Sequence, residues 1–221
     1  MTPGPAPAPA NEWATAAHAE DYLVRGRAYP PHRDEGEAVL VAELPERCRR
    51  VLDLGCGDGR LLALVLDTHP GATGVALDMS PPMLAAATAR FADDPRVEVV
   101  DHDLSRPLPH DLGCFDAVVS AFAIHHVEDE RKRTLYGEVL AALEPGGLFA
   151  NLEHVASPTE RLTTRFLAAV GARPGSRGDP SNRLLDVESQ LRWLRQLGYD
   201  DVDCHWKWRE LALLAGVRPP S

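Results

Sequence analysis

A short glycine-rich stretch carries the strongest chemical signal in the sequence. Residues 51–60 read VLDLGCGDGR, so an apolar run that contains Asp53 leads into glycines at alternate positions, Gly55, Gly57 and Gly59. Glycine lets the backbone turn tightly and approach a ligand closely. Asp78 ends the next apolar run, where its carboxylate could accept hydrogen bonds from both hydroxyls of a ribose. The pattern predicts a nucleotide site at one edge of a sheet.

Strands and helices alternate around this stretch. Short apolar runs predict parallel strands at 50–54, 72–78, 96–101, 115–121 and 147–153. The residues between and after them predict helices at 60–67, 81–92, 128–143, 158–170 and 186–197. Two alternating runs predict closing strands at 201–206 and 209–214. This order is typical of an α/β fold with a mostly parallel sheet covered on both faces.

Local signals mark the ends of several helices. Ser80 followed by proline predicts a capped helix that starts at Pro81, and residues 157–160 have the spacing of a capping box. We expect Asp186 to cap the helix that follows it and Gly198 to end that helix.

The N-terminal part differs in composition from the rest. Residues 1–10 read MTPGPAPAPA, a proline ladder that favours extended, solvated backbone, so we expect a disordered tail there. Helices are expected over 12–27 and 33–44, before the first strand. A length of 221 residues suits one sizeable α/β core, so we expect a single domain over 11–221.

Composition limits the function classes. The formal net charge is −10, and residues 1–155 carry 13 Lys and Arg against 25 Asp and Glu, whereas 156–221 carry 10 against 8. A nucleic-acid partner is therefore disfavoured, because phosphate contacts need clustered cations. The four cysteines stand singly, and no apolar run approaches the ~20 residues that span a bilayer. We expect a cytoplasmic protein with no disulfide framework, no zinc ribbon and no membrane segment.

With these residues the chain resembles the class I S-adenosylmethionine-dependent methyltransferases, whose first motif reads D-x-G-x-G-x-G. The resemblance extends over 20–215, and later motifs follow in the family's order, at 103–104, 115–120 with 124–126, and 143–147. It implies a Rossmann-like, doubly wound, mostly parallel sheet of seven strands with a C-terminal antiparallel strand. It also implies a helical cap over 11–46 and a catalytic core over 47–221.

The resemblance implies S-adenosylmethionine as the cofactor, and acids gathered at one sheet edge would suit its sulfonium cation. The residues expected to bind it are Asp53, Gly55, Cys56, Gly57, Asp78, Met79, Asp103, Leu104 and Ala121, with Arg33 and Tyr22 from the cap. Among them Asp78 would meet the ribose and Arg33 the carboxylate. A nicotinamide site requires G-x-G-x-x-G, and the position three after Gly57 is Arg60, so a dehydrogenase is disfavoured.

Histidines and an acid beside the ends of central strands are candidates for chemistry on the acceptor. We expect His126, His154 and Glu153 to be catalytic, orienting or deprotonating the acceptor, with His125 beside them in the acceptor site. The alternative is that His125 and His126 only pack the loop under the cofactor. The same residues could form a metal site, but no spacing dictates ligand geometry, so no metal is expected.

Two further regions are candidates for binding the acceptor. Trp206 and Trp208 share one face of an alternating strand and could form an aromatic wall, although paired tryptophans on a late strand more often pack in a core. Arg183 lies in a loop rich in glycine and proline, where it could grip a carboxylate or phosphate as part of a lid, or be a solvated loop residue.

These observations together predict transfer of a methyl group from S-adenosylmethionine to an oxygen or nitrogen atom of a small-molecule acceptor. Two alternatives stay open. The C-terminal strand pair resembles that of the wobble-uridine carboxymethyl-transfer enzymes that modify tRNA, and a cofactor-binding regulatory protein without turnover would carry the same motifs. We expect a monomer or a homodimer.

Overall fold

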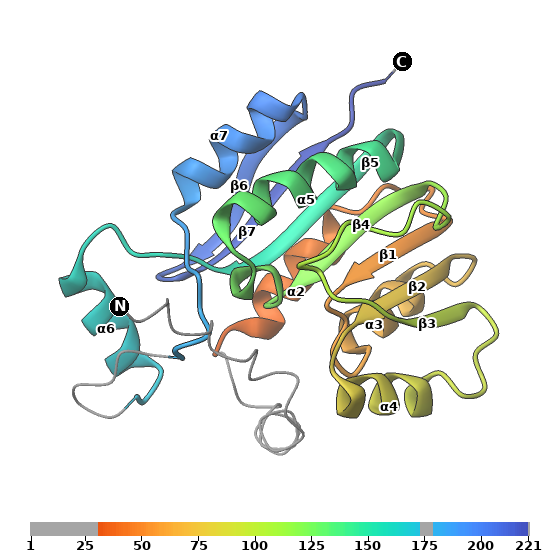
Figure 1. The fold of residues 1–221 in the computed structure, drawn as a ribbon, viewed down its shortest axis with the longest axis horizontal. Helices are drawn as coiled ribbons and strands as arrows, with labels where there is room; N and C mark the ends of the chain where they lie inside the picture. Colours follow the sequence, from red (N-terminus) through yellow and green to blue (C-terminus); the bar gives the residue numbers. More distant parts are fainter. Residues whose placement is uncertain (1–30, 173–178, 221) are drawn as a thin grey trace, which may run out of the picture.

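The computed structural model describes residues 31–172 and 179–220. Seven strands form one sheet at its centre (Figure 1): β1 (Arg50–Leu54), β2 (Thr73–Asp78), β3 (Val97–Asp101), β4 (Phe115–Ala121), β5 (Leu143–His154), β6 (Asp200–Trp208) and β7 (Leu211–Val217). Their order is β3-β2-β1-β4-β5-β7-β6. All run parallel except β7, which is antiparallel to both of its neighbours. The predicted doubly wound sheet with an antiparallel C-terminal strand is confirmed.

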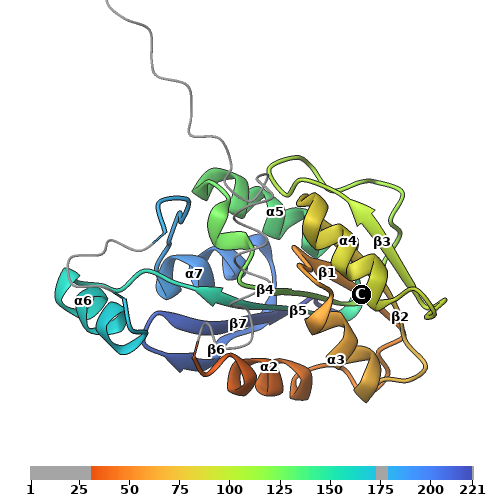
Figure 2. The same cartoon turned by 90° about the horizontal axis from the view of Figure 1, so that it is seen from below.

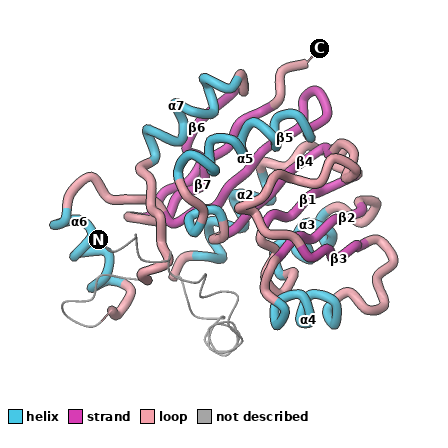
Figure 3. Tube along the Cα trace, in the orientation of Figure 1, coloured by secondary structure: helices cyan, strands magenta, loops and turns pink. Residues whose placement is uncertain are grey.

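Helices cover both faces of the sheet. One face carries α2 (Arg33–Ala42), α3 (Arg60–Thr68) and α4 (Pro81–Arg90), and the other carries α5 (Asp129–Ala142) and α7 (Val187–Leu197). Figure 2 shows α2 and α3 on the side of the sheet opposite to α5 and α7. The short 3-10 helix η2 (Ile124–His126) follows β4, and α6 (Glu160–Ala169) lies beyond the end of β5 (Figure 3).

Strand β1 shows how one strand serves both layers. Its side chains alternate between the faces, so Val51 packs in the same cluster as Leu62 of α3, whereas Leu52 and Leu54 pack in the cluster that contains Leu135 of α5. All of these side chains are buried. A strand buried on both faces is mostly apolar, which explains why Val51, Leu52 and Leu54 occur in one short run of the sequence.

The N-terminal predictions are only partly described. The tail at 1–10, the helix at 12–27 and Tyr22 lie outside the described residues. The second expected helix corresponds to α2, which lies against β5, β6, β7 and α3 on a sheet face, so only its start reaches the pocket described below.

Several local predictions hold and others need correction. Asp186 caps α7 by accepting from the backbone N–H of Ser189 at 2.8 Å, and Gly198 ends that helix with φ 101°. Ser80 makes no capping hydrogen bond, and its buried hydroxyl has no partner among the described residues. Thr159, not the predicted capping box, caps α6, and that helix therefore begins two residues later than expected.

The strand predicted at 147–153 is longer than expected. Leu143 already pairs with Phe115 of β4, and a register shift then accommodates the Pro145-Gly146-Gly147 turn within the same strand. The closing strands are also longer than predicted, because β7 pairs with β5 as far as Val217. Among the described residues, no helix is both long and apolar enough to cross a membrane.

Gly147 yields a prediction about this irregularity. A Cβ at Gly147 would lie 2.8 Å from the carbonyl oxygen of Glu144 and 3.1 Å from those of Phe115 and Asp116. Because backbone oxygens cannot move aside cheaply, Gly147→Ala should lower the free energy of unfolding by about 1–3 kcal/mol. Urea unfolding measures this, and Gly71→Ala is the control, since a Cβ there meets no described atom within 4 Å and should change stability by less than about 0.5 kcal/mol. Equal stability of the two variants would contradict this account.

Candidate active site

A pocket of about 980 Å³, including the part open to solvent, lies at the carboxyl edge of the sheet. Loops after four consecutive strands line it, together with the first residue of α2 and one residue of α4: Gly55–Asp58, Asp78–Met79, His102–Ser105, Ala121–Ala123, His126–Glu128, Arg33 and Met83. The pocket sits where the strand order reverses between β1 and β4, the position at which doubly wound sheets bind ligands.

The glycine loop after β1 touches the loop after β4. Gly55 has φ 67°, and a Cβ at this position would lie 2.2 Å from the Cβ of Ala123. Only glycine fits both the conformation and the contact. Cys56 and Gly57 follow and line the pocket, and the Cys56 thiol is buried, which raises its pKa. The thiol therefore stays protonated, and the loop offers backbone to a ligand.

Asp78 is held by the backbone on both of its oxygens. Oδ2 accepts from the N–H of Gly57 and Oδ1 from the N–H of Ser80, each at 2.8 Å. Burial raises the pKa of the carboxyl, and these amide donors oppose the rise. The carboxylate is thus fixed at the mouth of the glycine loop, with lone pairs that can accept further donors.

Asp53 lies beneath the loop, at 1% exposure, and does not line the pocket. Neither of its oxygens has a hydrogen-bond partner among the described residues. Burial, and then the neighbouring Asp78 carboxylate, raise the pKa of Asp53 to about 8. Four further acids line the pocket, namely Asp58, Asp78, Asp103 and Glu128. A buried carboxyl without a partner beside such a surface suits a cationic ligand.

The loop after β3 presents Asp103 and Leu104 to the pocket. Asp103 accepts from the N–H of Ser105 at 2.8 Å and from its hydroxyl at 2.7 Å. From outside, Arg131 of α5 donates from Nε to the carbonyl oxygen of Leu104 at 2.9 Å and pairs with Glu138 at 2.7 Å. Helix α5 therefore holds this loop in place.

Arg33 lies at the rim of the pocket. Its Nε donates to Glu37 at 2.6 Å, and its Cζ lies 5.5 Å from the centroid of the Phe122 ring. Glu37 is 1% exposed and also pairs with Arg60 of α3, so the two helices are joined through one buried carboxylate. Phe122 adopts φ 56°, a conformation that is uncommon for a residue with a side chain.

Of the predicted acceptor residues at the ends of β4 and β5, only His126 lines the pocket. Behind it, the ring of His125 is tilted by 44° to that of His126 with 4.0 Å between the centroids, and Nδ1 of His125 lies 2.5 Å from Oε1 of Glu153. His154 lies further back, with its Nε2 at 3.2 Å from Glu210. Glu153 and His154 do not line this pocket, and their expected action on the acceptor stays a prediction.

Burial favours the uncharged forms of His125, His126 and Glu153. It lowers the pKa of His125 and of His126 to about 3, and it raises the pKa of Glu153 to about 7. Glu153 is also within 3.4 Å of the amide of Asn151, which in turn contacts the hydroxyl of Tyr136. At neutral pH the pocket thus presents His126 as a neutral imidazole.

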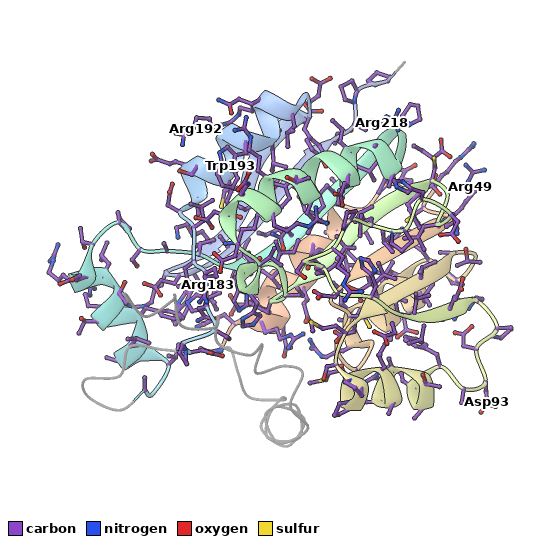
Figure 4. The ribbon with its side chains drawn as sticks, viewed as in Figure 1. Arg49, Asp93, Arg183, Arg192, Trp193 and Arg218 are labelled. Carbon is purple, nitrogen blue, oxygen red and sulfur yellow. The ribbon has the colours of Figure 1, made fainter. Side chains whose placement is uncertain are left out.

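Arg183 does not line the pocket. Its Nε donates to Glu128 at 2.8 Å, and its Nη1 donates to the carbonyl oxygens of Pro180 and Asn182. Figure 4 shows Arg183 at the end of the sheet opposite to Arg49 and Arg218. Its donors serve the loop and Glu128, and the expected grip on an anionic acceptor stays a prediction.

Trp206 and Trp208 do not line the pocket either. Trp206 packs on α2, where its ring comes within 3.2 Å of the position that a Cβ on Gly36 would take. The ring of Trp208 lies 4.5 Å from that of His32. The two partly buried indoles cover the start of α2, and the expected aromatic wall for the acceptor stays a prediction.

Sequence reasoning missed several residues of the pocket, namely Asp58, Met83, His102, Ser105, Phe122, Ala123, Val127 and Glu128. Most of them directly follow or precede a predicted site residue, so extending each motif by one or two positions along its loop would have found them. Glu37, which holds Arg33, had no such signal. Within the two described ranges, no three His, Cys, Asp or Glu side chains are arranged as ligands for a metal ion.

The chain is similar to known methyltransferases. Residues 51–147 match the family model of a methyltransferase domain. A demethylmenaquinone methyltransferase of Clavibacter sepedonicus is 38% identical over 198 residues, which are 82% of this chain and 78% of the relative. A trans-aconitate 2-methyltransferase of Methylobacterium radiotolerans is 34% identical over 159 residues, which are 69% of this chain and 57% of the relative.

The fold is also shared with solved structures. An O-methyltransferase family protein from Burkholderia thailandensis superimposes with a TM-score of 0.72 at 24% identity, over 95% of this chain and 62% of that one. The chain spans 55–57% of the length of several curated relatives that it matches. The match to the Clavibacter relative covers most of both proteins. The chain therefore belongs to the class I S-adenosylmethionine-dependent methyltransferase superfamily.

Proposed function

We propose that this chain transfers a methyl group from S-adenosylmethionine to an oxygen or nitrogen atom of a small-molecule acceptor. One observation carries the proposal: a single pocket joins the glycine loop, the doubly held Asp78 carboxylate and the Asp103 loop at the carboxyl edge of the sheet. Two relatives are named for small molecules, trans-aconitate and demethylmenaquinone. A net charge of −10 makes nucleic acid a poor acceptor.

The residues in this pocket fit the cofactor of the superfamily. Asp78 is oriented to accept from the ribose hydroxyls, and Met79 and Leu104 supply apolar surface for the adenine ring. We assign Asp103 to the amino group of adenine and Arg33 to the carboxylate of the methionine part, because both residues line the pocket. When bound, the cofactor supplies a methyl group on a positively charged sulfur, and the surrounding acids stabilise that charge.

On the acceptor side the chain mainly has to align atoms. The attacking atom, the methyl carbon and the sulfur must lie in line at contact distance, so rigid placement of the acceptor lowers the barrier. His126 is the candidate that touches the acceptor, because it lines the pocket. Glu153 and His154 act through His125 and are positioning residues.

Other sequence predictions stay predictions. A cytoplasmic setting is consistent with the free thiols of all four cysteines. The same holds for the monomer or homodimer and for the single domain over 11–221.

Calorimetry with S-adenosylhomocysteine and a transfer assay with labelled S-adenosylmethionine test the proposal. We expect saturable binding of the product, and label incorporated into at least one hydroxylated or amino compound from a metabolite panel. Failure of the folded chain to take up either nucleotide would overturn the proposal. Binding without transfer to any acceptor would leave a cofactor-binding regulatory protein.

Asp78→Asn tests the ribose contact. The change removes a charged acceptor, so the dissociation constant for S-adenosylhomocysteine should rise about 10- to 100-fold, as expected for loss of roughly 1.5–3 kcal/mol of charged hydrogen bonding. Asp101→Asn is the control, because Asp101 pairs in register with Asp78 at the end of β3, is exposed and does not line the pocket. Equal affinities for the two variants would count against the assignment of Asp78.

The raised pKa of Asp53 predicts that a proton is released when S-adenosylmethionine binds. With a pKa of about 8 it is largely protonated at pH 7, and a bound cation favours its carboxylate form, so its pKa must fall and a proton must leave. Affinity for S-adenosylmethionine should therefore rise with pH up to about 8, by at most about tenfold per pH unit. Calorimetry in buffers of different ionisation enthalpy measures the proton, and Asp53→Asn should abolish it. A proton count that is the same in the variant would disprove the role of Asp53.

A further inference from the structure

Ser181 and Asp179 hold the ring of His126 from the side of the loop that precedes α7. The Ser181 hydroxyl lies 3.0 Å from Nδ1 of His126 and 2.7 Å from Oδ1 of Asp179. The backbone N–H of Ser181 donates to the same carboxylate oxygen at 2.8 Å. These contacts join residues that are 55 positions apart in the sequence.

The direction of these hydrogen bonds determines the tautomer. An ionised aspartate only accepts, so the hydrogen of the Ser181 hydroxyl points to Asp179. The same hydroxyl can then only accept from His126, which requires a hydrogen on Nδ1. In a neutral imidazole the lone pair consequently lies on Nε2. Burial favours the neutral ring, since it lowers the pKa of His126.

The segment that carries Ser181 is fastened to the elements around the pocket. The N–H of Arg183 donates to the carbonyl oxygen of His125 at 2.7 Å, and the carbonyl oxygen of Arg183 accepts from Lys132 of α5. Lys132 is 2% exposed and also pairs with Asp129 at 2.7 Å. Ser181 is therefore held at a defined distance from η2, as a positioning residue must be.

The charges around the pocket affect which class of acceptor can bind. Its described walls carry four acids and one cation, Arg33, which is paired with the buried Glu37. A carboxylate acceptor would meet repulsion there and would find a lone pair, not a donor, on Nε2 of His126. A hydroxyl or N–H acceptor would instead donate to Nε2.

We propose that Asp179 and Ser181 are positioning residues that hold His126 as the Nδ1–H tautomer, so that its Nε2 accepts from the reacting hydroxyl or N–H group and selects such acceptors over carboxylates. The inference rests on the proposed function. For a hydroxyl, the acceptor oxygen forms the bond to the methyl carbon, and the electron pair of the broken carbon–sulfur bond stays on sulfur. The acceptor proton passes to Nε2 and then to solvent.

The tautomer can be measured without any turnover. Full-length chain with ¹⁵N-labelled histidine, examined by long-range ¹H–¹⁵N correlation, should show a protonated Nδ1 and an unprotonated Nε2 for His126, assigned by loss of the signals in His126→Gln. Ser181→Ala should give a mixture of tautomers, and Ser181→Thr should restore the wild-type pattern. Asp179→Asn provides a second route, because its amide can donate to the hydroxyl and should raise the share of Nε2–H.

Ser189→Ala is the matched control, since it removes a hydroxyl that accepts from Arg192 on α7. It should leave the His126 signals unchanged. An Nε2–H tautomer in the wild-type chain, or a pattern that none of the changes at 179 and 181 alters, would overturn the positioning role whatever the activity.

Kinetics test the selection of acceptors. In Ser181→Ala, kcat/KM for a hydroxylated or amino acceptor should fall about 10- to 100-fold, with the dissociation constant for S-adenosylhomocysteine unchanged, and Ser181→Thr should recover most of the rate. Preferred turnover of carboxylate acceptors by the wild-type chain would overturn the selection. Failure to bind either nucleotide would refute the proposed function, whereas the spectrum alone decides the tautomer.

Discussion

Repulsion between carboxyl groups is the constraint on which the rest of this site depends. Parallel strands bring Asp53, Asp78 and Asp103 to one edge of the sheet, and the loops add Asp58. Each group is accommodated differently. Backbone amides hold Asp78, Ser105 donates to Asp103, Arg90 pairs with Asp58 at 2.5 Å, and Asp53 is buried with a raised pKa. The acids at this edge still repel one another, and a cation bound on this surface lowers the electrostatic energy.

The layers of the fold keep these groups at fixed distances. The glycine at position 55 lets the loops after β1 and β4 lie in close contact, and α5 secures the loop after β3 through Arg131. On the other face, Glu37 of α2 pairs with Arg33 of the same helix and with Arg60 of α3, and the second pair ties the two helices together. The cofactor side of the pocket is thus built from rigid elements, which suits a reaction whose main requirement is alignment.

The fold and the cofactor side could be predicted from the sequence because their signals are local. The apolar run of β1, the glycines after it and Asp78 each owe their type to backbone geometry within a few residues. The family membership is confirmed by the same segments. The capping residues were predicted less well. Ser80 and Thr159 each directly precede a helix, but only the Thr159 side chain accepts a capping hydrogen bond.

The acceptor side could not be predicted in the same way because it depends on contacts between distant segments. No residue near His126 in the sequence predicts its contact with Ser181. Likewise, no residue near Arg183 predicts that its Nε donates to Glu128. The tryptophans illustrate the same limit. A bulge between Cys204 and Trp206 shifts the pairing of β6 with β7, and the position of α2 decides what the indoles cover.

Strand β6 is an edge strand of the sheet, which affects how molecules of this protein could associate. An edge strand has unpaired backbone N–H and C=O groups, to which a strand of another molecule could bind. Here Asp200, Asp201 and Asp203 are all exposed on that strand, and Asp201 has φ 50°, which bends the backbone out of regular pairing. The acids on the β6 strands of two molecules would repel each other. Edge-to-edge pairing of sheets through β6, and aggregation by that route, are therefore disfavoured.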